Sequence, residues 1–500
     1  MMEKSLFLGI DLGTTGIKVI MMQADGKVID KNYADYTILS PKADYAEQDP
    51  DDWWDSLCRV SQELMARNAG LLERIVGVGV TGQMHTQVYL DMHGNTLGNA
   101  ITWMDQRCQT LVDQMNQSHR ATIFRHTANC LTTTYTAPHI MWVRNNEPDL
   151  YSKTRKILLA KDYLKYKLTG EMVTDYSDAS GTLLFDVAAK KWSSEMFELF
   201  GVEESLMPHV DKSALVIGEV TREASRLTGI PAGVRVINGC ADHAATSLGA
   251  GVVNAGDASA IIGTAGVLSI LSDEAVPDCE HGSLCWNYCL DDKWVNLAVM
   301  QTAGESLNWF KRAFDETSDN DVFDMYNIEA GKIPEGSGGL VFLPYLMGER
   351  NPHWDPNARG VFFGIGLGHE KFHFVRAIME GVGFAYKNNL ELVKSLGVEI
   401  NELRLLGGGA KSPLWRDILA RILNTRIKTV QVEETGALGS CLLCGLALGI
   451  FDDIGAASAA LVNLGDDYYY EEMPNIYEKN YQVFKALYPS LRGLYGKLAF

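Results

Sequence analysis

The stretch that decides the fold is Leu6-Phe-Leu-Gly-Ile-Asp-Leu-Gly-Thr-Thr-Gly-Ile-Lys-Val-Ile-Met21, near the start of the chain. An apolar run leads into Asp11, a Gly-Thr-Thr-Gly turn follows, and a second apolar run leaves the turn. This pattern predicts a strand, a tight turn and a second strand, because Gly13 and Gly16 tolerate backbone angles that other residues avoid.

The turn between these two strands is suited to phosphate. It would present backbone N–H groups and the hydroxyls of Thr14 and Thr15 as a nest for an anion. Asp11 lies beside the turn and is a hard oxygen ligand for a magnesium–phosphate complex, usually through water. An ordinary β-hairpin with a surface aspartate explains the stretch equally well, so a second observation is needed.

That second observation is a repeat of this strand–turn–strand pattern in the other half of the chain. Residues 258–271 form an apolar run, the turn Gly263-Thr-Ala-Gly266 and another apolar run, with Ile261 where the first copy has Asp11. Two such hairpins predict two related halves, residues 1–250 and 251–500, each with its own phosphate loop. The loop of the second half contains Gly263 and Thr264, which correspond to Gly13 and Thr14 in the first. One aspartate and two loops are what a single nucleotide site between two lobes needs.

Composition and charge restrict the class of protein. Five hundred residues are too many for one hydrophobic core, so at least two domains are expected. The net charge of −19 argues against binding to nucleic acid or to an anionic membrane surface. Positive potential for phosphate would therefore have to be local, from backbone amides and magnesium.

The cysteine pattern and the apolar runs predict a soluble cytoplasmic protein. Nine scattered cysteines suit reduced thiols better than a disulfide framework. Cys441 and Cys444 form a CxxC pair inside the apolar run 437–451, where core packing is the favoured role. That run is the longest one and is too short to span a bilayer, and no signal peptide is recognisable.

Two polar segments follow apolar strands, where open α/β sheets bind ligands. The first follows the run 75–80 and contains Gln83, Met84 and His85, which could face hydroxyl groups, although a structural histidine is the commoner case. The second contains Trp103 and Asp105, followed by Arg107. These side chains suit the wall of a polyol site, and a plain salt-bridged loop is an equal alternative.

Asp242 is the candidate base. A strand over residues 234–238 ends in glycine, and Asp242 and His243 open a helix rich in small residues. A carboxylate at a helix N-terminus normally has a depressed pKa, so we expect a low value here. It can still accept a proton from a hydroxyl polarised by phosphate and metal. The alternative role for Asp242 is a helix N-cap.

A glycine-rich turn predicts contact with a flat ligand. Residues 403–412 form a strand followed by three glycines, and a helix begins at Pro413. Gly408 and Gly409 would let backbone approach a nucleotide base, and a plain glycine turn is the alternative. The chain has no GxxxxGK[ST] motif and this turn is not GxGxxG, so P-loop and Rossmann enzymes fit poorly.

The chain resembles the FGGY carbohydrate kinases of the actin/Hsp70/hexokinase superfamily. The C-terminal signature of that family appears as Gly360-x-Phe362-x-Gly364-Ile365 and, seven residues later, His373-Phe374-x-x-Ala377-Ile378-Met379-Glu380. Within the family the resemblance is to xylulokinases. It rests on further motifs: Ile10–Lys18, Glu47–Pro50, Gly82–His85, Leu159–Tyr163, Tyr345–Arg350 and Gly407–Ala410.

The resemblance implies an α/β fold with two RNase H-like domains around a central cleft, and ATP and Mg²⁺ as ligands. Asp242 would deprotonate the sugar hydroxyl, Asp11 would position Mg²⁺, and Met84 and His85 would contact the sugar. Xylulokinases usually have Asn where this chain has His243, which would also face the sugar. The residues implied to line the nucleotide are Thr14, Thr264, Gly304, Gly408, Gly409 and Ser412.

The predicted function is ATP-dependent phosphorylation of a sugar. The first choice of substrate is D-xylulose, phosphorylated at its terminal hydroxyl. The nearest alternative is a sibling kinase for another ketose, a polyol or an aldonate. An alternative of another class is an actin/Hsp70-like ATPase or a sugar-responsive regulator that transfers no phosphate to sugar. The expected partners are sugar and ATP, with no nucleic acid and no membrane, and a homodimer is compatible with the sequence.

Overall fold

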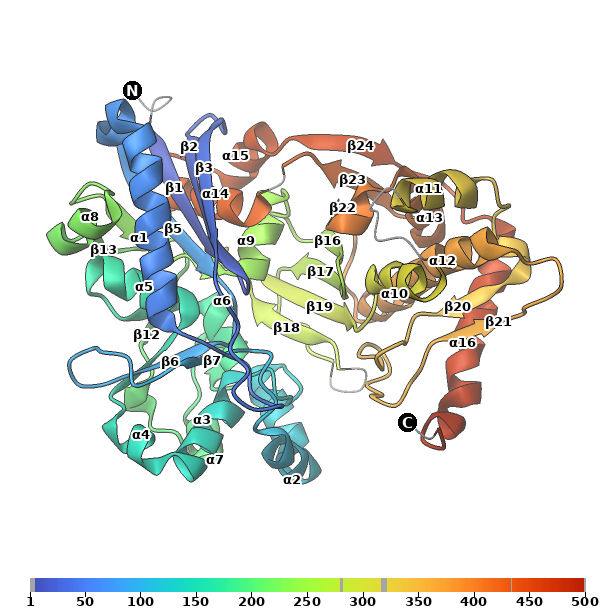
Figure 1. Ribbon diagram of the computed structural model, residues 1–500, viewed down its shortest axis with the longest axis horizontal. Helices are drawn as coiled ribbons and strands as arrows, with labels where there is room; N and C mark the ends of the chain where they lie inside the picture. Colours follow the sequence, from blue (N-terminus) through green and yellow to red (C-terminus); the bar gives the residue numbers. More distant parts are fainter. Residues whose placement is uncertain (1–4, 279–281, 316–321, 433, 499–500) are drawn as a thin grey trace.

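Two seven-stranded sheets carry the chain, one from each half of the sequence (Figure 1). The computed structural model describes residues 5–278, 282–315, 322–432 and 434–498. The first sheet has the order β13-β14-β5-β1-β2-β3, with β15 paired to β5. Its strands are β1 Leu6–Leu12, β2 Gly16–Gln23, β3 Val28–Asp35, β5 Ile75–Gly82, β13 Val216–Glu219, β14 Arg235–Ile237 and β15 Cys240–Ala241.

The second sheet repeats the pattern of the first. Its order is β18-β19-β17-β16-β22-β23-β24. In both sheets, two parallel strands extend from the first strand of an antiparallel hairpin. In the first sheet β5 pairs with β1 and β14 with β5, and in the second β22 pairs with β16 and β23 with β22. The strands are β16 Asp257–Ile262, β17 Gly266–Ser272, β18 Leu284–Asn287, β19 Trp294–Met300, β22 Glu402–Leu406, β23 Arg426–Val430 and β24 Leu464–Tyr468. The two predicted hairpins therefore occupy matching places.

The glycines of the two turns have a different role from the one predicted. None of Gly13, Gly16, Gly263 and Gly266 has a positive φ angle. A Cβ atom at Gly16 would lie 2.6 Å from the carbonyl oxygen of Ala34, and one at Gly266 would lie 2.8 Å from the Tyr386 hydroxyl. Gly16 and Gly266 are therefore needed for close packing, and the expectation of special backbone angles at Gly13 and Gly16 was wrong.

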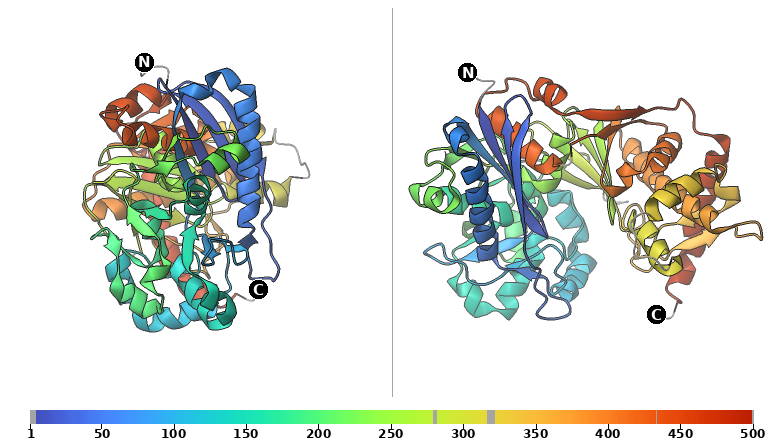
Figure 2. Two further views of the ribbon diagram at one scale, coloured as in Figure 1. Left: turned by 90° about the vertical axis from the view of Figure 1, so that its left-hand side faces the viewer. Right: turned by 45° about the horizontal axis from the view of Figure 1, so that its top comes forward.

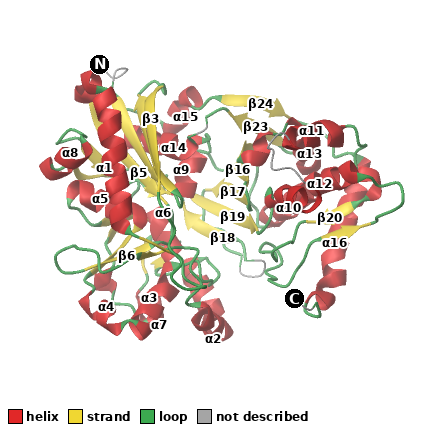
Figure 3. Cartoon of the chain, viewed as in Figure 1, coloured by secondary structure: helices red, strands yellow, loops and turns green. Residues whose placement is uncertain are grey.

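Helices cover both sheets (Figure 3). On the first sheet, α1 (Pro50–Arg67) packs against β2 and β3, and the predicted cap is present because the Asp49 carboxylate accepts from the Asp51 amide at 2.9 Å. The other helices of the first half before residue 242 are α2 Gln109–Thr127, α3 Thr136–Asn146, α4 Pro148–Lys153, α5 Ala160–Thr169, α6 Tyr176–Ala179, α7 Ser194–Phe200 and α8 Arg222–Thr228. The short strands are β4 Glu47–Gln48, β6 Gln87–Leu90, β7 Ala100–Ile101, β8 Lys156–Leu159, β9 Val173–Asp175, β10 Phe185–Asp186, β11 Lys191–Trp192 and β12 His209–Asp211.

Two helices join the halves. Helix α9 (Asp242–Gly249) packs against α14 (Thr435–Ala447), and α14 lies on β1 and β5 although it comes from the second half (Figure 2). A Cβ atom at Gly9 would lie 2.3 Å from the carbonyl oxygen of Ala437, so the contact is very close. Cys441 and Cys444 are free and buried in this helix, which confirms the predicted packing role.

The remaining helices belong to the second half of the chain. Helix α12 is long and packs against α13 and against β20. These elements are α10 Glu305–Phe314, α11 Val322–Gly331, α12 Lys371–Ser395, α13 Pro413–Leu423, α15 Ile454–Leu461, α16 Asn475–Tyr495, β20 Val341–Leu343 and β21 Val361–Phe363. Within the described ranges, no helix combines the length and the apolar character needed to cross a membrane.

Candidate active site

Asp242 lies at the end of β15, a short strand that is parallel to β5 in the first sheet. It follows β15 directly and is the first residue of α9. Its Oδ1 accepts from the amide of His243 at 2.7 Å, and no side-chain cap precedes it. Burial raises the pKa of the Asp242 carboxyl to about 7, and the charges of Asp11 and Asp178 add to the effect. The expected low pKa was wrong, because burial outweighs the dipole of a short helix.

Asp11 is the second-to-last residue of β1, which lies between β5 and its own hairpin partner β2, and is half-buried. Burial raises the pKa of its carboxyl to about 6, an effect that Lys18 opposes. Gly436, in the first turn of α14, leaves space at this carboxylate, because a Cβ atom there would lie 2.7 Å from Oδ2. A carboxylate with open space beside it fits the hard oxygen donor that Mg²⁺ or its bound water requires.

The first loop forms a tight turn around Thr14 and Thr15. The amide of Gly13 donates to the carbonyl of Gly16 at 3.0 Å, which closes the turn. Among the described residues, the amides of Thr14 and Thr15 have no hydrogen-bond partner, so they can bind an anion. A cavity of about 610 Å³ adjoins the loop and is lined by Asp11, Gly13, Thr15, Gly16, Lys18, Lys31, Asn32, Tyr33 and Glu434.

Gln83 links the polar segment after β5 to this loop. Its Nε2 donates to Oε1 of Gln48 at 2.7 Å, and Gln48 Nε2 donates to the carbonyl of Thr14 at 2.7 Å. Gln83 is fully buried, and its neighbour Met84 lies in the hydrophobic core. The structure therefore gives Gln83 a part in holding the loop that contains Thr14.

His85 is held as a neutral imidazole. It has a φ of 65°, and its Nδ1 lies 2.6 Å from the carbonyl oxygen of Gly181. Burial lowers the pKa of His85 to about 4. Nδ1 must carry the proton to donate to Gly181, so Nε2 is left as an acceptor. The ring packs edge-on against Tyr135 and Trp286, with centroids 4.9 and 5.7 Å away.

His243 faces the same aromatic ring from the start of α9. Its centroid lies 4.9 Å from that of Trp286, and burial lowers its pKa to about 3. Neither ring nitrogen has a hydrogen-bond partner among the described residues, although both are buried. A neutral imidazole offers one donor and one acceptor, so His243 can serve a pair of sugar hydroxyls.

Trp286 belongs to this site and was missed by sequence reasoning. It lies in β18 of the second sheet, and its Nε1 donates to Oδ1 of Asn129 at 2.6 Å. The Tyr135 hydroxyl donates to the same oxygen at 3.1 Å. The residues between Trp286 and His85 in the chain number about two hundred, and neither segment carries a motif that links them. Only the fold brings them together.

Trp103 and Asp105 have different environments in the structure. Trp103 is partly exposed, and its Nε1 donates to the hydroxyl of Thr14 at 3.1 Å. Asp105 is fully buried and is paired with Arg107 through two contacts of 2.8 Å, while the amide of Ala46 donates to it at 2.7 Å. The oxygens of Asp105 are already occupied, which favours the salt-bridged alternative, and its place in the sugar wall stays a prediction.

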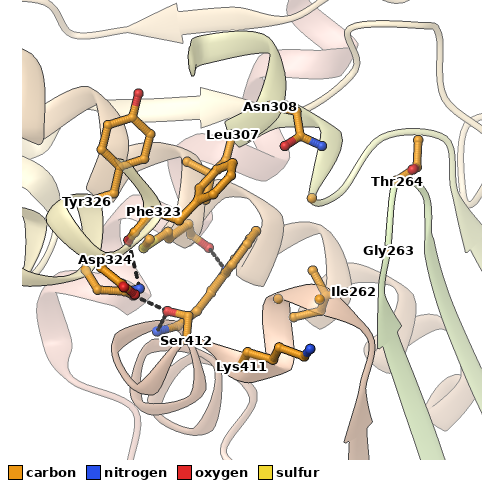
Figure 4. Close-up of a pocket in the computed structure, with 16 residues that line it drawn as sticks. Ile262, Gly263, Thr264, Leu307, Asn308, Phe323, Asp324, Tyr326, Lys411 and Ser412 are labelled. Atoms are coloured by element: carbon orange, nitrogen blue, oxygen red, sulfur yellow. Dashed lines mark hydrogen bonds between the residues drawn. The ribbon is translucent and has the colours of Figure 1, made fainter. Parts of the chain in front are cut away.

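The second loop lines a different cavity, of about 420 Å³ (Figure 4). The predicted Gly263, Thr264, Gly304, Gly408, Gly409 and Ser412 all line it. Helix α11, which sequence reasoning did not include, contributes Phe323, Asp324, Tyr326 and Asn327. Apolar side chains and glycine backbone make the cavity suited to a flat ring system.

The turn of this second loop is stabilised from the start of α10. The amide of Gly304 donates to the carbonyl of Gly263 at 2.7 Å, and the amide of Ala303 donates to that of Thr264 at 2.9 Å. Ser412 caps α13 by accepting from the amide of Trp415 at 3.0 Å, and its hydroxyl donates to Asn327. Thr264 and Ser412 lie on opposite sides of the cavity (Figure 4).

The two loops thus line separate cavities. A clamp of both loops on one nucleotide stays a prediction that requires the halves to approach each other. Within the described residues, no group of three or more His, Cys, Asp or Glu side chains could hold a metal ion directly. A metal at Asp11 would therefore rely on water and on the phosphates of a bound nucleotide.

Two family models match the chain. Residues 6–249 match the N-terminal domain of the FGGY family of carbohydrate kinases, and residues 258–448 match its C-terminal domain. Together the two matches leave only the ends of the chain and a short junction uncovered. The C-terminal match contains the residues of the second cavity, and the N-terminal match contains Asp11 and Asp242.

Individual relatives point to the same class of enzyme. A xylulose kinase of Lactococcus lactis is 34% identical over 489 residues, which is 96% of this chain and 96% of that protein. A gluconokinase of Bacillus subtilis is 27% identical over 464 residues, 91% of this chain and 90% of that protein. The crystal structure of a xylulose kinase from Rhodospirillum rubrum superposes with a TM-score of 0.92 at 28% identity and covers 98% of this chain and 99% of that one.

Proposed function

This chain belongs to the FGGY family of carbohydrate kinases, with the two-domain fold of actin- and hexokinase-like ATPases, and we propose that it transfers the γ-phosphate of ATP to the terminal hydroxyl of D-xylulose. The observation that carries the proposal is the position of Asp242. This half-buried residue follows β15 directly, its carboxylate interacts electrostatically with Asp11 at the first phosphate loop, and it is adjacent in the chain to the neutral imidazole of His243. Full-length similarity to a xylulose kinase supports the choice of sugar.

In the proposed reaction Asp242 acts as the general base. Its carboxylate accepts the proton of the sugar hydroxyl as the hydroxyl oxygen forms a bond to the γ-phosphorus. The bond from that phosphorus to the bridging oxygen of ADP breaks at the same time, and ADP leaves with the electron pair. A pKa of about 7 suits this role, because a base is most effective when its pKa lies near the working pH. The remaining contribution is positioning and charge stabilisation.

Asp11 would hold Mg²⁺ through water beside the first loop. The open space left by Gly436 at its carboxylate supports this role. When bound, Mg²⁺ neutralises charge on the phosphates. The amides of Thr14 and Thr15 would bind phosphate oxygens from the same side, and the second cavity would take the adenine ring against Phe323. His85 and His243 would hold sugar hydroxyls, with Trp286 as the wall.

The compartment, the assembly and the closed state are further proposals. We place the enzyme in the cytoplasm, because the cysteines that the structure describes are all free thiols. We also propose a homodimer, which light scattering on the purified protein would test. The units that close on the substrates would be residues 1–250 and 251–500, and small-angle scattering with and without both ligands would detect that closure.

The test of the function is ADP release measured with a panel of sugars. The panel holds D-xylulose, other ketoses, polyols and D-gluconate, since a gluconokinase is among the relatives. We expect ADP release to require sugar and to have its highest kcat/KM with D-xylulose. A higher kcat/KM with another sugar would replace xylulose with that substrate. ATP hydrolysis at the same rate without sugar would make the protein an ATPase instead of a kinase.

A further inference from the structure

A cluster of buried charges lies beneath the segment that carries Asp242. Lys161 Nζ lies 2.7 Å from Asp162, 2.8 Å from Asp175 and 2.9 Å from Asp178. Lys165 joins the cluster through Asp162 at 2.8 Å. All five side chains are fully buried. Buried charges are costly unless they are paired, so this cluster forms one coupled unit and not a set of independent contacts.

Asp175 is the central member of the cluster. Its Oδ1 pairs with Lys161, and its Oδ2 accepts from three donors. Those donors are the Ser177 hydroxyl at 2.5 Å, the Ser177 amide at 2.9 Å and the Ser213 hydroxyl at 2.7 Å. The carboxylate is therefore held on both oxygens, and the two serines are oriented by it.

Ser177 connects this cluster to the candidate base. Its Oγ accepts from the amide of Ala241 at 3.0 Å, and Ala241 is the residue before Asp242. Because the Ser177 proton is committed to Asp175, its lone pair is available for the Ala241 amide. At the other end of the same segment, Lys165 Nζ donates to the carbonyl of Asn238 at 2.6 Å. Residues 238–241 are thus anchored at both ends by the cluster.

We propose that Ser177 is a positioning residue that holds the backbone before Asp242 so that the base meets the sugar hydroxyl. The inference rests on the proposed function, in which Asp242 is that base. Its physical basis is the sensitivity of proton transfer to geometry, since a displacement of about 1 Å can cost roughly 100-fold in rate. Asp178 links the same cluster to the charge of the base, because its carboxylate raises the pKa of Asp242.

Ser213 provides a matched control. Its hydroxyl donates to the same oxygen of Asp175 as Ser177 does, and it is equally buried. In the described structure, the Ser213 side chain makes no hydrogen bond to residues 240–242. Ser177→Ala and Ser213→Ala therefore remove the same interaction with Asp175, and only Ser177→Ala also removes the acceptor of the Ala241 amide.

The test is steady-state kinetics of both variants, with thermal unfolding measured alongside. We expect Ser177→Ala to lower kcat by about 10- to 100-fold while KM for ATP and for sugar changes less than about twofold. Ser213→Ala should keep kcat within about twofold of wild type, with a similar loss of thermal stability. Near-normal kcat in Ser177→Ala, an equal loss in both variants, or a change confined to KM would each overturn the proposal.

Two provisions keep the result decisive. If Ser177→Ala does not fold, Ser177→Cys carries the same prediction, because a thiol of similar size accepts hydrogen bonds weakly. If wild type prefers a sugar other than D-xylulose, the substrate assignment fails, and the variants are compared with the preferred sugar. If wild type phosphorylates no sugar, both the proposed function and this inference are overturned.

Discussion

The two Gly-Thr hairpins have the same backbone plan and different surroundings. In the first, Asp11 lies near the end of the strand, and the adjoining cavity is lined by the charged side chains of Lys18, Lys31 and Glu434. In the second, Ile261 takes the place of Asp11, and the cavity contains Leu307, Phe323, Met379 and Trp415. One loop is thus surrounded by charge and the other mainly by apolar side chains.

This difference shows how a repeated unit can divide one reaction between its copies. In the proposed reaction, the first copy contains the groups that would handle the phosphate charge and the sugar proton, namely Asp11 and Asp242. The second copy has Ile261 in place of a carboxylate and, in the same proposal, its cavity would take the nucleotide base. Charge in the second cavity would require pairing or a cost in desolvation, so replacing an aspartate by isoleucine suits its task.

The largest expected effect is on the first copy, at the proposed base. Asp242→Ala should lower kcat by roughly 10²- to 10⁴-fold, because general base catalysis typically contributes this much. Nucleotide affinity should stay near that of wild type, since the second cavity is unchanged. Stopped or coupled assays of ADP release and calorimetry with ADP measure the two quantities. Turnover within a few-fold of wild type would remove Asp242 from the role of base.

The next effect tests the difference between Asp11 in the first hairpin and Ile261 at the equivalent position of the second hairpin. Asp11→Asn should lower activity at moderate Mg²⁺ concentration by roughly 10- to 100-fold, as expected for a group that holds a metal through water. Added Mg²⁺ should recover part of the loss. The matched control is Ile261→Val, at the equivalent place in the second hairpin, which should change kcat less than about twofold. Equal losses in the two variants would contradict the division of roles.

A smaller effect is expected in the second cavity. Phe323→Ala should raise KM for ATP roughly tenfold, because stacking of a base on an aromatic ring contributes about 1–3 kcal/mol. kcat at saturating ATP and KM for the sugar should hardly change. Phe314→Ala serves as the control, since this exposed ring in α10 does not line the cavity. A rise in the KM for sugar instead would place the nucleotide elsewhere.

The smallest effect is the dependence of activity on pH, which distinguishes titration of Asp242 from titration of the two histidines. The pKa of Asp242 is raised to about 7, so its reactive ionised form is lost as pH falls through that value. kcat/KM for the sugar should therefore drop about tenfold between pH 8 and pH 6. His85 and His243, with pKa values of about 4 and 3, stay neutral over this range.

The control for this profile is enzyme held at each pH and assayed again at pH 8, where full recovery excludes unfolding. A flat profile from pH 8 to pH 6 would show that no group with a pKa near 7 limits the reaction.

Local sequence patterns predicted the α/β class and both hairpins, because apolar runs interrupted by glycine turns constrain the backbone locally. They also predicted Gly263, Thr264, Gly408 and Gly409, whereas Gly304 and Ser412 were implied only by the family resemblance, and all six residues line one cavity. Burial could not be predicted in the same way. Asp242 has a raised pKa and Asp105 is saturated by Arg107, and both facts depend on which segments pack over them. The position of Trp286 beside His85 likewise follows from the pairing of β18 with β19 in the second sheet.

The most direct measurement is a crystal structure with a non-hydrolysable ATP analogue, Mg²⁺ and D-xylulose bound together. The account predicts the adenine ring beside Phe323, the terminal phosphate at the amides of Thr14 and Thr15, and the terminal sugar hydroxyl about 2.6–3.2 Å from Asp242. It would be contradicted by a sugar whose hydroxyls all lie out of reach of Asp242, or by phosphates bound away from the loop beside Asp11.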